Sequence, residues 1–351
     1  MSNITGVYEH IITTMDIEKS LRYWKELGFN VINQGTVSQE MSKKLYGVNG
    51  EATSYRLKCA DLDSHGLLRI LDWADKTLIS ENQWSSNVLS PGNRWVTQRT
   101  DDIIALTYAY DDDKKRGGQW LISDLVRNYL GASGVGTDFY NRYKGVYEVL
   151  VHGLEAKQVF FQRVGYSIEG YGTITENPLL CSEFTHGGIV VRNLDHINFY
   201  VDVLGLIDEG KTLQGTPRKM GQDSGPFMNN IGEGYHAHTI VSPNQKAGRI
   251  YYAMPIQDYE NLTDGAKQVM DVIKYAENTT NGIIDVIGKS KPGVRGLCSA
   301  SYKAKNIQDL YSKVKQSTAT YLTELCDNEF EEKSFTFVAP DGVHWTIVEW
   351  K

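Results

Sequence analysis

The alternation of apolar and polar positions predicts strands and helices in a recurring order. From Val7, a run of apolar and β-branched residues predicts a strand. Asp16, a residue suited to cap a helix, then precedes an amphipathic segment that ends at Gly28. The segment from Thr185 has the same order and ends at Gly205. The chain is therefore expected to use one strand-helix-strand unit more than once.

Two further copies of this unit are predicted. A third begins at Val146, with Gly165 ending its helix, and a fourth, weaker copy begins near Val294. The stretch from Arg94 also has the outline of a strand followed by a helix. Residues 93–182 are therefore compatible with more than one division into modules.

Each unit is expected to close with a hairpin of strands. The segment 334–351 alternates apolar residues on either side of the sequence Pro340-Asp341-Gly342, which is suited to a turn. The segments 236–256 and 53–75 have a similar form. Long polar or glycine-rich stretches between these elements are expected to be loops or lids.

Length and composition narrow the class of protein. A chain of 351 residues exceeds the usual size of one hydrophobic core, and 41% hydrophobic with 23% charged residues is typical of a folded protein. The net charge of -7 argues against a nucleic-acid partner, and the four cysteines, without a C-x-x-C pair, are expected to be reduced thiols. The lack of a long apolar run and of a signal-like start predicts a cytoplasmic protein with no membrane segment.

A helix ending in LGF (residues 27–29) or LGL (204–206), with a closing strand after a PDG turn, resembles the vicinal oxygen chelate superfamily. That superfamily includes glyoxalase I, extradiol dioxygenases and bleomycin-binding proteins. The resemblance covers residues 5–78, 183–256 and 293–351 well and 93–182 in part.

The resemblance implies an α+β fold in which repeated βαβββ modules pair into two curved, cup-shaped mixed sheets. In chain order this gives an N-terminal domain over residues 1–182 and a C-terminal domain over 183–351. The alternative is that the first module pairs with the last, which would bring Glu9 or His10 beside Glu349. The sequence is compatible with both pairings of the modules.

The resemblance also implies positions for metal ligands. In family members with a metal, one ligand lies on the first strand, seven residues before the Asp or Asn that starts the helix, and another lies on the last strand. The first-strand rule selects Glu9, His186 and, in the final module, Ser299. The last-strand rule selects residues in three modules, namely Asp72, Met254 and Glu349.

These ligand sets are incomplete for iron. A related extradiol dioxygenase would supply two histidines and a glutamate for Fe(II). The C-terminal pair offers only His186 and Glu349. His236 or His238 would supply the third ligand only in a rearranged cup. The N-terminal pair offers an oxygen-rich set of carboxylates, namely Glu9, Asp72 and Glu148. These carboxylates would either hold a hard cation or be solvated.

Several candidates also have a structural interpretation. His186 would serve as a hydrogen-bonded strand residue, and Glu349 as a surface carboxylate. His10 points to the face opposite Glu9 by strand alternation, so a structural role is expected for it. Tyrosines such as Tyr252 serve packing more often than chemistry.

The leading hypothesis is a small-molecule lyase or isomerase that acts by proton transfer or bond cleavage next to a carbonyl or enol of an oxygenated cyclic metabolite. A divalent metal (Fe, Mn, Ni or Zn) would act as a Lewis acid, or His186 and Glu349 would act as base and acid without one. The alternatives are an Fe(II) ring-cleaving dioxygenase and a non-catalytic binding protein, and a homodimer is compatible with each. The expected site comprises catalytic His186, Glu349 and His238, with Tyr252, His236, Met254 and Ser299 at the substrate; the metal candidates are His186 and Glu349, or Glu9 and Asp72.

Overall fold

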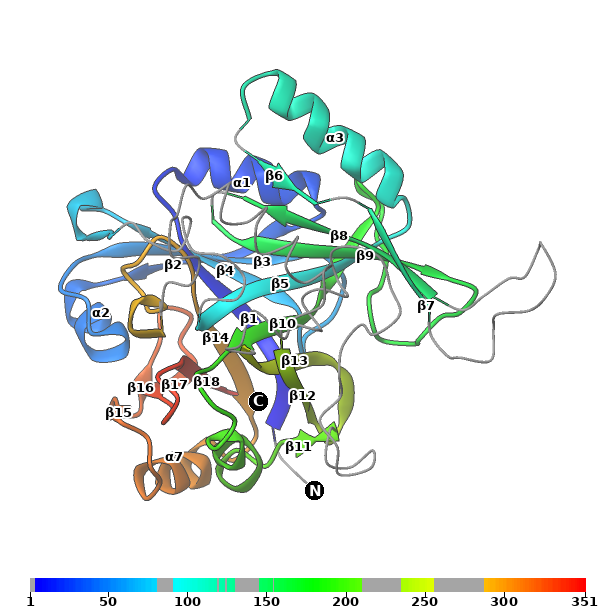
Figure 1. The fold of residues 1–351 in the computed structure, drawn as a ribbon. Helices are drawn as coiled ribbons and strands as arrows, with labels where there is room; N and C mark the ends of the chain where they lie inside the picture. Colours follow the sequence, from blue (N-terminus) through cyan, green and yellow to red (C-terminus); the bar gives the residue numbers. More distant parts are fainter. Residues whose placement is uncertain are drawn as a thin grey trace.

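Strands from distant parts of the chain form two mixed β-sheets in the computed structural model (Figure 1). The structure describes residues 4–80, 91–118, 120–123, 125–129, 145–153, 155–209, 235–255 and 287–351. Among the described residues, none of the helices combines the length and apolar character that crossing a membrane requires. The four cysteines are free thiols, as expected.

The first sheet, here called the terminal sheet, joins the two ends of the chain. Its strand order is β15-β17-β18-β14-β1-β4-β3-β2, with β16 beside β17. The strands are β1 (Ile4–Thr13), β2 (Asn30–Val37), β3 (Ala52–Lys58), β4 (Leu67–Trp73), β14 (Gly296–Ala304), β15 (Tyr321–Leu322), β16 (Cys326–Asp327), β17 (Lys333–Val338) and β18 (His344–Glu349).

The second sheet, here called the middle sheet, comes from the centre of the chain. Its order is β11-β12-β13-β10-β5-β9-β8-β6, with β7 beside β8. The strands are β5 (Gly92–Thr100), β6 (Leu121–Ile122), β7 (Val126–Tyr129), β8 (Gly145–His152), β9 (Lys157–Val164), β10 (Cys181–Val190), β11 (Ile207–Asp208), β12 (Tyr235–Ser242) and β13 (Gln245–Pro255).

Helices follow the first strand of each module, which confirms the repeated βαβββ pattern. Asp16 caps α1 (Ile17–Glu26) by accepting a hydrogen bond from the backbone N–H of Lys19, and Gly28 follows with a φ of 91°. The other helices are α2 (Gln39–Tyr46), α3 (Ile103–Lys115), α7 (Ile307–Lys315), the π-turn η3 (Phe199–Val203) and the short 3₁₀ turns η1 (Lys76–Leu78) and η5 (Ile287–Lys289).

The first module pairs with the last, and the second with the third. Strand β1 pairs antiparallel with β14, placing Glu9 opposite Ser301, and β5 pairs antiparallel with β10, placing Thr97 opposite His186. The division expected after residue 182 falls between β9 and β10, which lie in one sheet. The two sheets therefore do not follow the division into 1–182 and 183–351.

The expectation that Val146 opens a separate module was wrong. Strand β8 turns directly into β9 without a helix, and the two strands pair in register from Gly145 opposite Val164 to His152 opposite Lys157. The β-branched and aromatic residues of β9 favour a strand. This strand propensity outweighs the helical pattern from which a helix was predicted there. Strands β5 to β9 form one module with α3.

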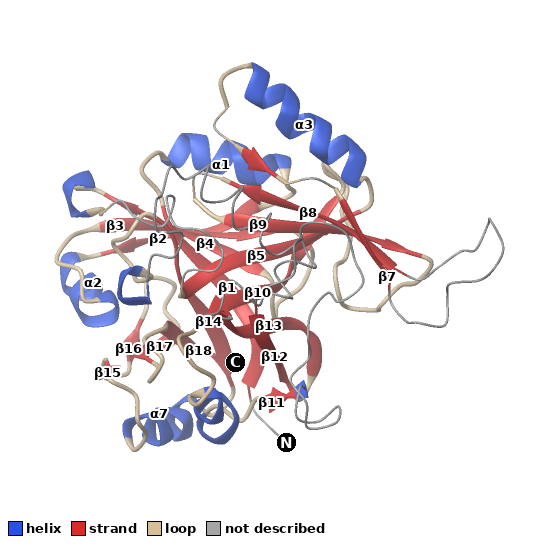
Figure 2. Ribbon diagram, viewed as in Figure 1, coloured by secondary structure: helices blue, strands red, loops and turns tan. Residues whose placement is uncertain are grey.

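The two sheets pack toward each other with the faces that carry α1, α3, α7 and η3, here called inner faces, whereas α2 packs on the opposite face of the terminal sheet. One core joins α1 and α3 to both sheets and includes Trp24, Leu106, Ile70 and Phe160. A second core joins α7 and η3 to both sheets. In Figure 2, α1 and α3 lie at one end of the molecule and α7 lies at the other. The opposite faces of the two sheets, here called outer faces, point away from each other.

The inner faces approach closely at their centre. A Cβ atom added at Gly187 of β10 would lie 2.6 Å from Cε1 of His10 on β1. The His10 ring also makes an edge contact with Phe184, with ring centroids 5.3 Å apart. His10 thus has a packing role on the face opposite Glu9, and the glycine at 187 makes room for it.

Candidate functional site

The two residues expected to converge, His186 and Glu349, lie on different sheets. His186 is on β10 in the middle sheet, on the outer face. Glu349 is at the end of β18 in the terminal sheet, opposite Ala304, a residue of an inner core. The structure does not bring these side chains together, because the pairing of first with last modules separates β10 from β18.

Three other expected residues lie on the inner face, opposite to His186. His238 Nδ1 lies 2.8 Å from Asp208 Oδ2. The Tyr252 hydroxyl donates a hydrogen bond to Asp341 Oδ2 at 2.9 Å. Met254 packs against the core around α7. The side chain of His236 lies outside the described residues.

The outer face of the terminal sheet carries a buried ion-pair cluster around Glu9. The Glu9 carboxylate accepts hydrogen bonds from Arg56 Nε at 2.6 Å, Arg69 Nη2 at 2.7 Å and Ser301 Oγ at 2.8 Å. Burial alone would raise the pKa of Glu9, but the charges of Arg56 and Arg69 outweigh it and lower the pKa to about 2. Glu9 is therefore ionised and fully engaged by protein partners.

Asp72 and Ser299 do not join Glu9 in a site. Asp72 alternates with Leu71 along β4, lies on the inner face and pairs with Lys76. Ser299 donates a hydrogen bond to the backbone carbonyl of His344 at 3.0 Å. Of the oxygen-rich set expected at the N-terminal module, Glu9 and Asp72 thus lie on opposite faces of the terminal sheet, and Glu148 lies on β8 of the middle sheet.

The described residues do not fit a divalent cation. No three His, Cys, Asp or Glu side chains among them gather as a metal site. Beside Glu9 stands the Arg69 guanidinium, and the charges of Arg163 and Arg249 act on His186. A fixed positive charge at these positions disfavours a metal ion and favours an anion.

On the outer face of the middle sheet, His186 is held by two hydroxyl groups. Its Nδ1 lies 2.6 Å from the Tyr171 hydroxyl and 2.9 Å from Thr185 Oγ1. The Tyr171 ring is stacked at 6.0 Å and 6° to the imidazole, and Tyr251 meets it edge-on at 4.9 Å. The His186 side chain is only 9% exposed, so the imidazole and its two hydroxyl partners are largely shielded from solvent.

Both hydroxyl partners of His186 lie at Nδ1. The Thr185 hydroxyl donates to the Thr97 carbonyl at 3.2 Å, so toward His186 its oxygen is an acceptor, whereas the Tyr171 hydroxyl is able to donate or to accept. Among the described residues Nε2 makes no hydrogen bond, and in the tautomer with the proton on Nδ1 it carries the lone pair. Burial, followed by the charges of Arg249, His10 and Arg163, lowers the pKa of His186 well below its ordinary value, so the ring is neutral.

Arg163 has an unusual environment next to this histidine. All three guanidinium nitrogens are buried, and none makes a hydrogen bond of good geometry with the described residues. The guanidinium carbon lies 5.3, 5.7 and 5.1 Å from the ring centroids of Phe161, Tyr166 and Tyr171. A buried donor group without acceptors is costly, which makes this group a candidate for binding an anion.

A second arginine also lies close to the Tyr171 ring. Arg249 is 5.2 Å from the ring centroid of Tyr171 and pairs with Glu209 Oε2 at 3.3 Å. Glu148 is opposite Phe161 on β8 and so shares this outer face, and burial raises its pKa to about 8. The face therefore combines arginines, a neutral imidazole and a carboxyl group that is protonated at neutral pH.

Sequence reasoning found His186 but missed most of its neighbours. Arg249 and Tyr251 alternate along β13 and therefore point to one face, and this period-two spacing was a readable signal. Tyr171 comes from the connection between β9 and β10, and no linear pattern places it over His186. Arg163 becomes notable only once its lack of partners is known.

Comparisons with known proteins agree with the observed fold. No family model matches the sequence, and no curated protein is similar to it. Glyoxalase I from Zea mays matches 98% of this chain and 92% of its own, with a TM-score of 0.51 and 11% identity. A Bacillus subtilis protein named as a dioxygenase matches 99% of this chain and 86% of its own, with a TM-score of 0.55 and 9% identity. Identities this low show a shared fold alone. The chain has the glyoxalase-like βαβββ fold of the vicinal oxygen chelate superfamily.

Proposed function

We propose that this protein is a small-molecule lyase or isomerase whose site is the outer face of the middle sheet around His186. The observation that carries the proposal is the neutral imidazole of His186, held at Nδ1 by Tyr171 and Thr185 beside two arginines. Its substrate is an oxygenated metabolite that carries a carboxylate or phosphate.

The charged groups around His186 are the basis of the proposed reaction. Burial is the main cause of the low pKa of His186, and a substrate anion placed against Arg249 and Arg163 offsets the charges that lower it further. The imidazole then becomes a stronger base, and Nε2 takes a proton from the carbon next to the substrate carbonyl. The arginines stabilise the negative charge that develops on the oxygen of the enolate.

Hydrogen-deuterium exchange at the substrate carbon tests this reaction without knowledge of the full product. Small 2-oxo acids and hydroxylated ring carboxylates would first be screened for a rise in melting temperature, because a ligand of the native state stabilises by mass action. Compounds that bind are then incubated with the protein in D₂O, and exchange is followed by NMR.

The expected result is exchange with the wild type and a loss of about a hundredfold or more with His186→Gln. His196→Gln, a change at a partly exposed histidine, is the matched control and retains exchange. Binding without exchange would instead support the non-catalytic alternative, which the aromatic rings around His186 also suit. Full exchange with His186→Gln would remove the proposed site.

The ring-cleaving dioxygenase alternative is less well supported. Fe(II) in such enzymes is held by two histidines and a carboxylate. Among the described residues, His10 and His238 lie on inner faces, and no three His, Cys, Asp or Glu side chains gather as such a site around His186.

A further inference from the structure

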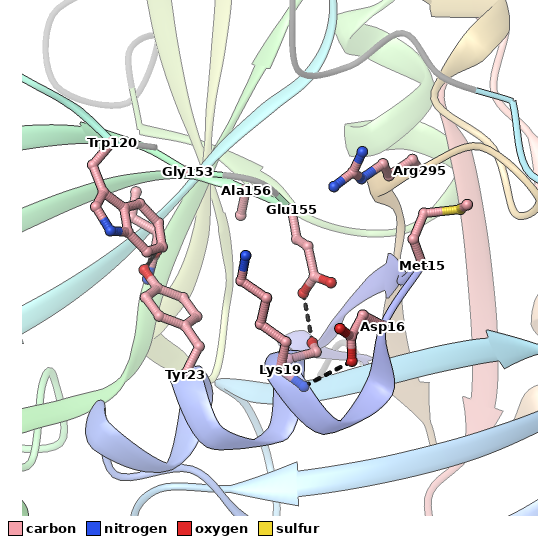
Figure 3. Close-up of a pocket in the computed structure, with 11 residues that line it drawn as sticks. Met15, Asp16, Lys19, Tyr23, Trp120, Gly153, Glu155, Ala156 and Arg295 are labelled. Atoms are coloured by element: carbon pink, nitrogen blue, oxygen red, sulfur yellow. Dashed lines mark hydrogen bonds between the residues drawn. The ribbon is translucent and has the colours of Figure 1, made fainter. Parts of the chain in front are cut away.

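A cavity of about 310 Å³ lies at the N-terminal end of α1, away from the outer face that carries His186. Figure 3 shows its walls, which come from α1, from the connection between β8 and β9, and from the segment before β14. The residues that define its chemistry are Lys19, Tyr23, Trp120, Gly153, Glu155 and Arg295. It shares no lining residue with the cluster around His186.

One wall of the cavity is aromatic. The rings of Tyr23 and Trp120 are stacked, with centroids 5.0 Å apart and planes at 23°. Their polar atoms are already used, because the Tyr23 hydroxyl lies 2.7 Å from the Tyr110 hydroxyl and Trp120 Nε1 donates to Asp113 Oδ2 at 2.6 Å. The pair therefore offers the cavity ring surface only.

Gly153 keeps Trp120 in this position. A Cβ atom at Gly153 would lie 2.6 Å from Cζ3 of the indole, so a larger residue would displace the ring. The aromatic wall is thus built on a position that only glycine fits without movement, and it suits a flat ring.

The other side of the cavity is charged. The ammonium group of Lys19 points into the space between the aromatic pair and Glu155, and the Arg295 guanidinium lies beyond Glu155 (Figure 3). Among the described residues Lys19 makes no ion pair, whereas the Glu155 carboxylate accepts hydrogen bonds from Thr14 and, at 2.5 Å, from Ser20 Oγ. The lysine charge is available to a ligand, while the carboxylate oxygens already have donors.

The N-terminal end of α1 adds no free positive charge, because the Asp16 carboxylate, which also lines the cavity, caps it and Glu18 lies in its first turn. The positive charge of the cavity comes from the Lys19 and Arg295 side chains. Cavities of this size in proteins accept small metabolites.

We propose that this cavity is a second small-molecule site, which binds a planar ring bearing a carboxylate. The ring lies against Tyr23 and Trp120, and the carboxylate meets Lys19, with Arg295 adding positive charge. The proposal does not depend on the reaction assigned to His186.

Benzoate, its neutral analogue benzamide and the cationic benzylamine are the probes, with affinity measured by calorimetric titration of the full chain. Benzoate is expected to bind at least about tenfold more tightly than either of the others, which corresponds to about 1.4 kcal/mol. Lys19→Gln is expected to weaken benzoate binding by about tenfold. Lys25→Gln, a change at an exposed lysine at the far end of the same helix, is the matched control and leaves it unchanged.

Three results would overturn the proposal. The first is no benzoate binding by the wild type, and the second is tighter binding of benzylamine than of benzoate, which would make Glu155 the anchor. The third is benzoate binding that survives Lys19→Gln and disappears with Arg163→Met, which would place the anion at the outer face near His186. Both lysines are exposed, so both variants are expected to fold, and equal melting temperatures check this.

Discussion

The Glu9 carboxylate and the Arg69 guanidinium form an ion pair of 2.7 Å in which neither side chain is exposed to solvent. Arg69 comes from β4 and Ser301, the third partner of Glu9, from β14, so the contact ties the first module to the last. A buried charge cluster thus occupies the place where the family resemblance suggested a metal ligand.

Removing the charge of Glu9 is expected to destabilise the protein strongly. Glu9→Gln leaves Arg56 and Arg69 buried with less compensating charge, and the expected loss in free energy of unfolding is about 3–5 kcal/mol, measured by urea unfolding. Glu40→Gln breaks the exposed Glu40–Lys44 pair, also 2.7 Å long, and is expected to change stability little. Equal effects of the two variants would contradict the importance of the buried cluster.

The same cluster predicts a loss of stability in acid. The pKa of Glu9 is about 2 in the native state and about 4.3 in an unfolded chain, so the unfolded state binds the proton first. The contribution of ionised Glu9 to the free energy of unfolding is complete above about pH 4.3. It is lost as the pH falls toward about 2. Urea unfolding at a series of pH values would show it, and Glu9→Gln should have a flatter profile in this window.

Three buried histidines are expected to remain neutral at mildly acidic pH. Burial lowers the pKa of His10 to about 3 and that of His344 to about 4, and burial together with neighbouring charges holds the pKa of His186 well below its ordinary value. Unfolded histidines take up protons near pH 6.5, so these groups reduce stability as the pH falls below that value. NMR signals of the three imidazoles should not titrate between pH 5 and 8, and titration of His10 there would contradict its burial between the sheets.

The close contact between the sheets predicts a specific coupling. Gly187→Ala places a methyl group against the His10 ring and is expected to cost about 1–3 kcal/mol. Gly288→Ala, at a position with open space around it, is the matched control. Combining Gly187→Ala with His10→Ala should cost less than the sum of the single changes, whereas strict additivity would mean that the two residues do not touch.

Arg163 is expected to trade stability for ligand binding. Arg163→Met removes a buried guanidinium that makes no hydrogen bond of good geometry with the described residues, and it should raise the free energy of unfolding by about 1–3 kcal/mol in the absence of ligand. The same variant should lose the rise in melting temperature that anionic ligands of the outer face produce. Arg22→Met, at an exposed arginine of α1, should change neither quantity. A strongly destabilised Arg163→Met would show that the guanidinium is a structural support.

The repeated module was readable because local chemistry specifies it. The Asp16 cap and the glycine at 28 mark the two ends of α1, and the structure confirms both positions. The stretch from Val146 was misread because a short amphipathic segment suits a helix or a strand until its partners are known. Its partner turned out to be the adjacent strand within the same module.

The sequence by itself determined the α+β class, the βαβββ repeat and the choice of His186 as a residue of interest. Only the tertiary structure decided that β1 pairs with β14, that His186 and Glu349 lie on separate sheets, and that Tyr171 and Arg163 gather around the histidine. The physical reason is that helix caps and strand periodicity act over a few residues, whereas strand partners are chosen across the whole chain. Any sheet edge with unpaired backbone groups and a matching apolar face can pair with an added strand. Which strand pairs there therefore depends on how all the faces pack together.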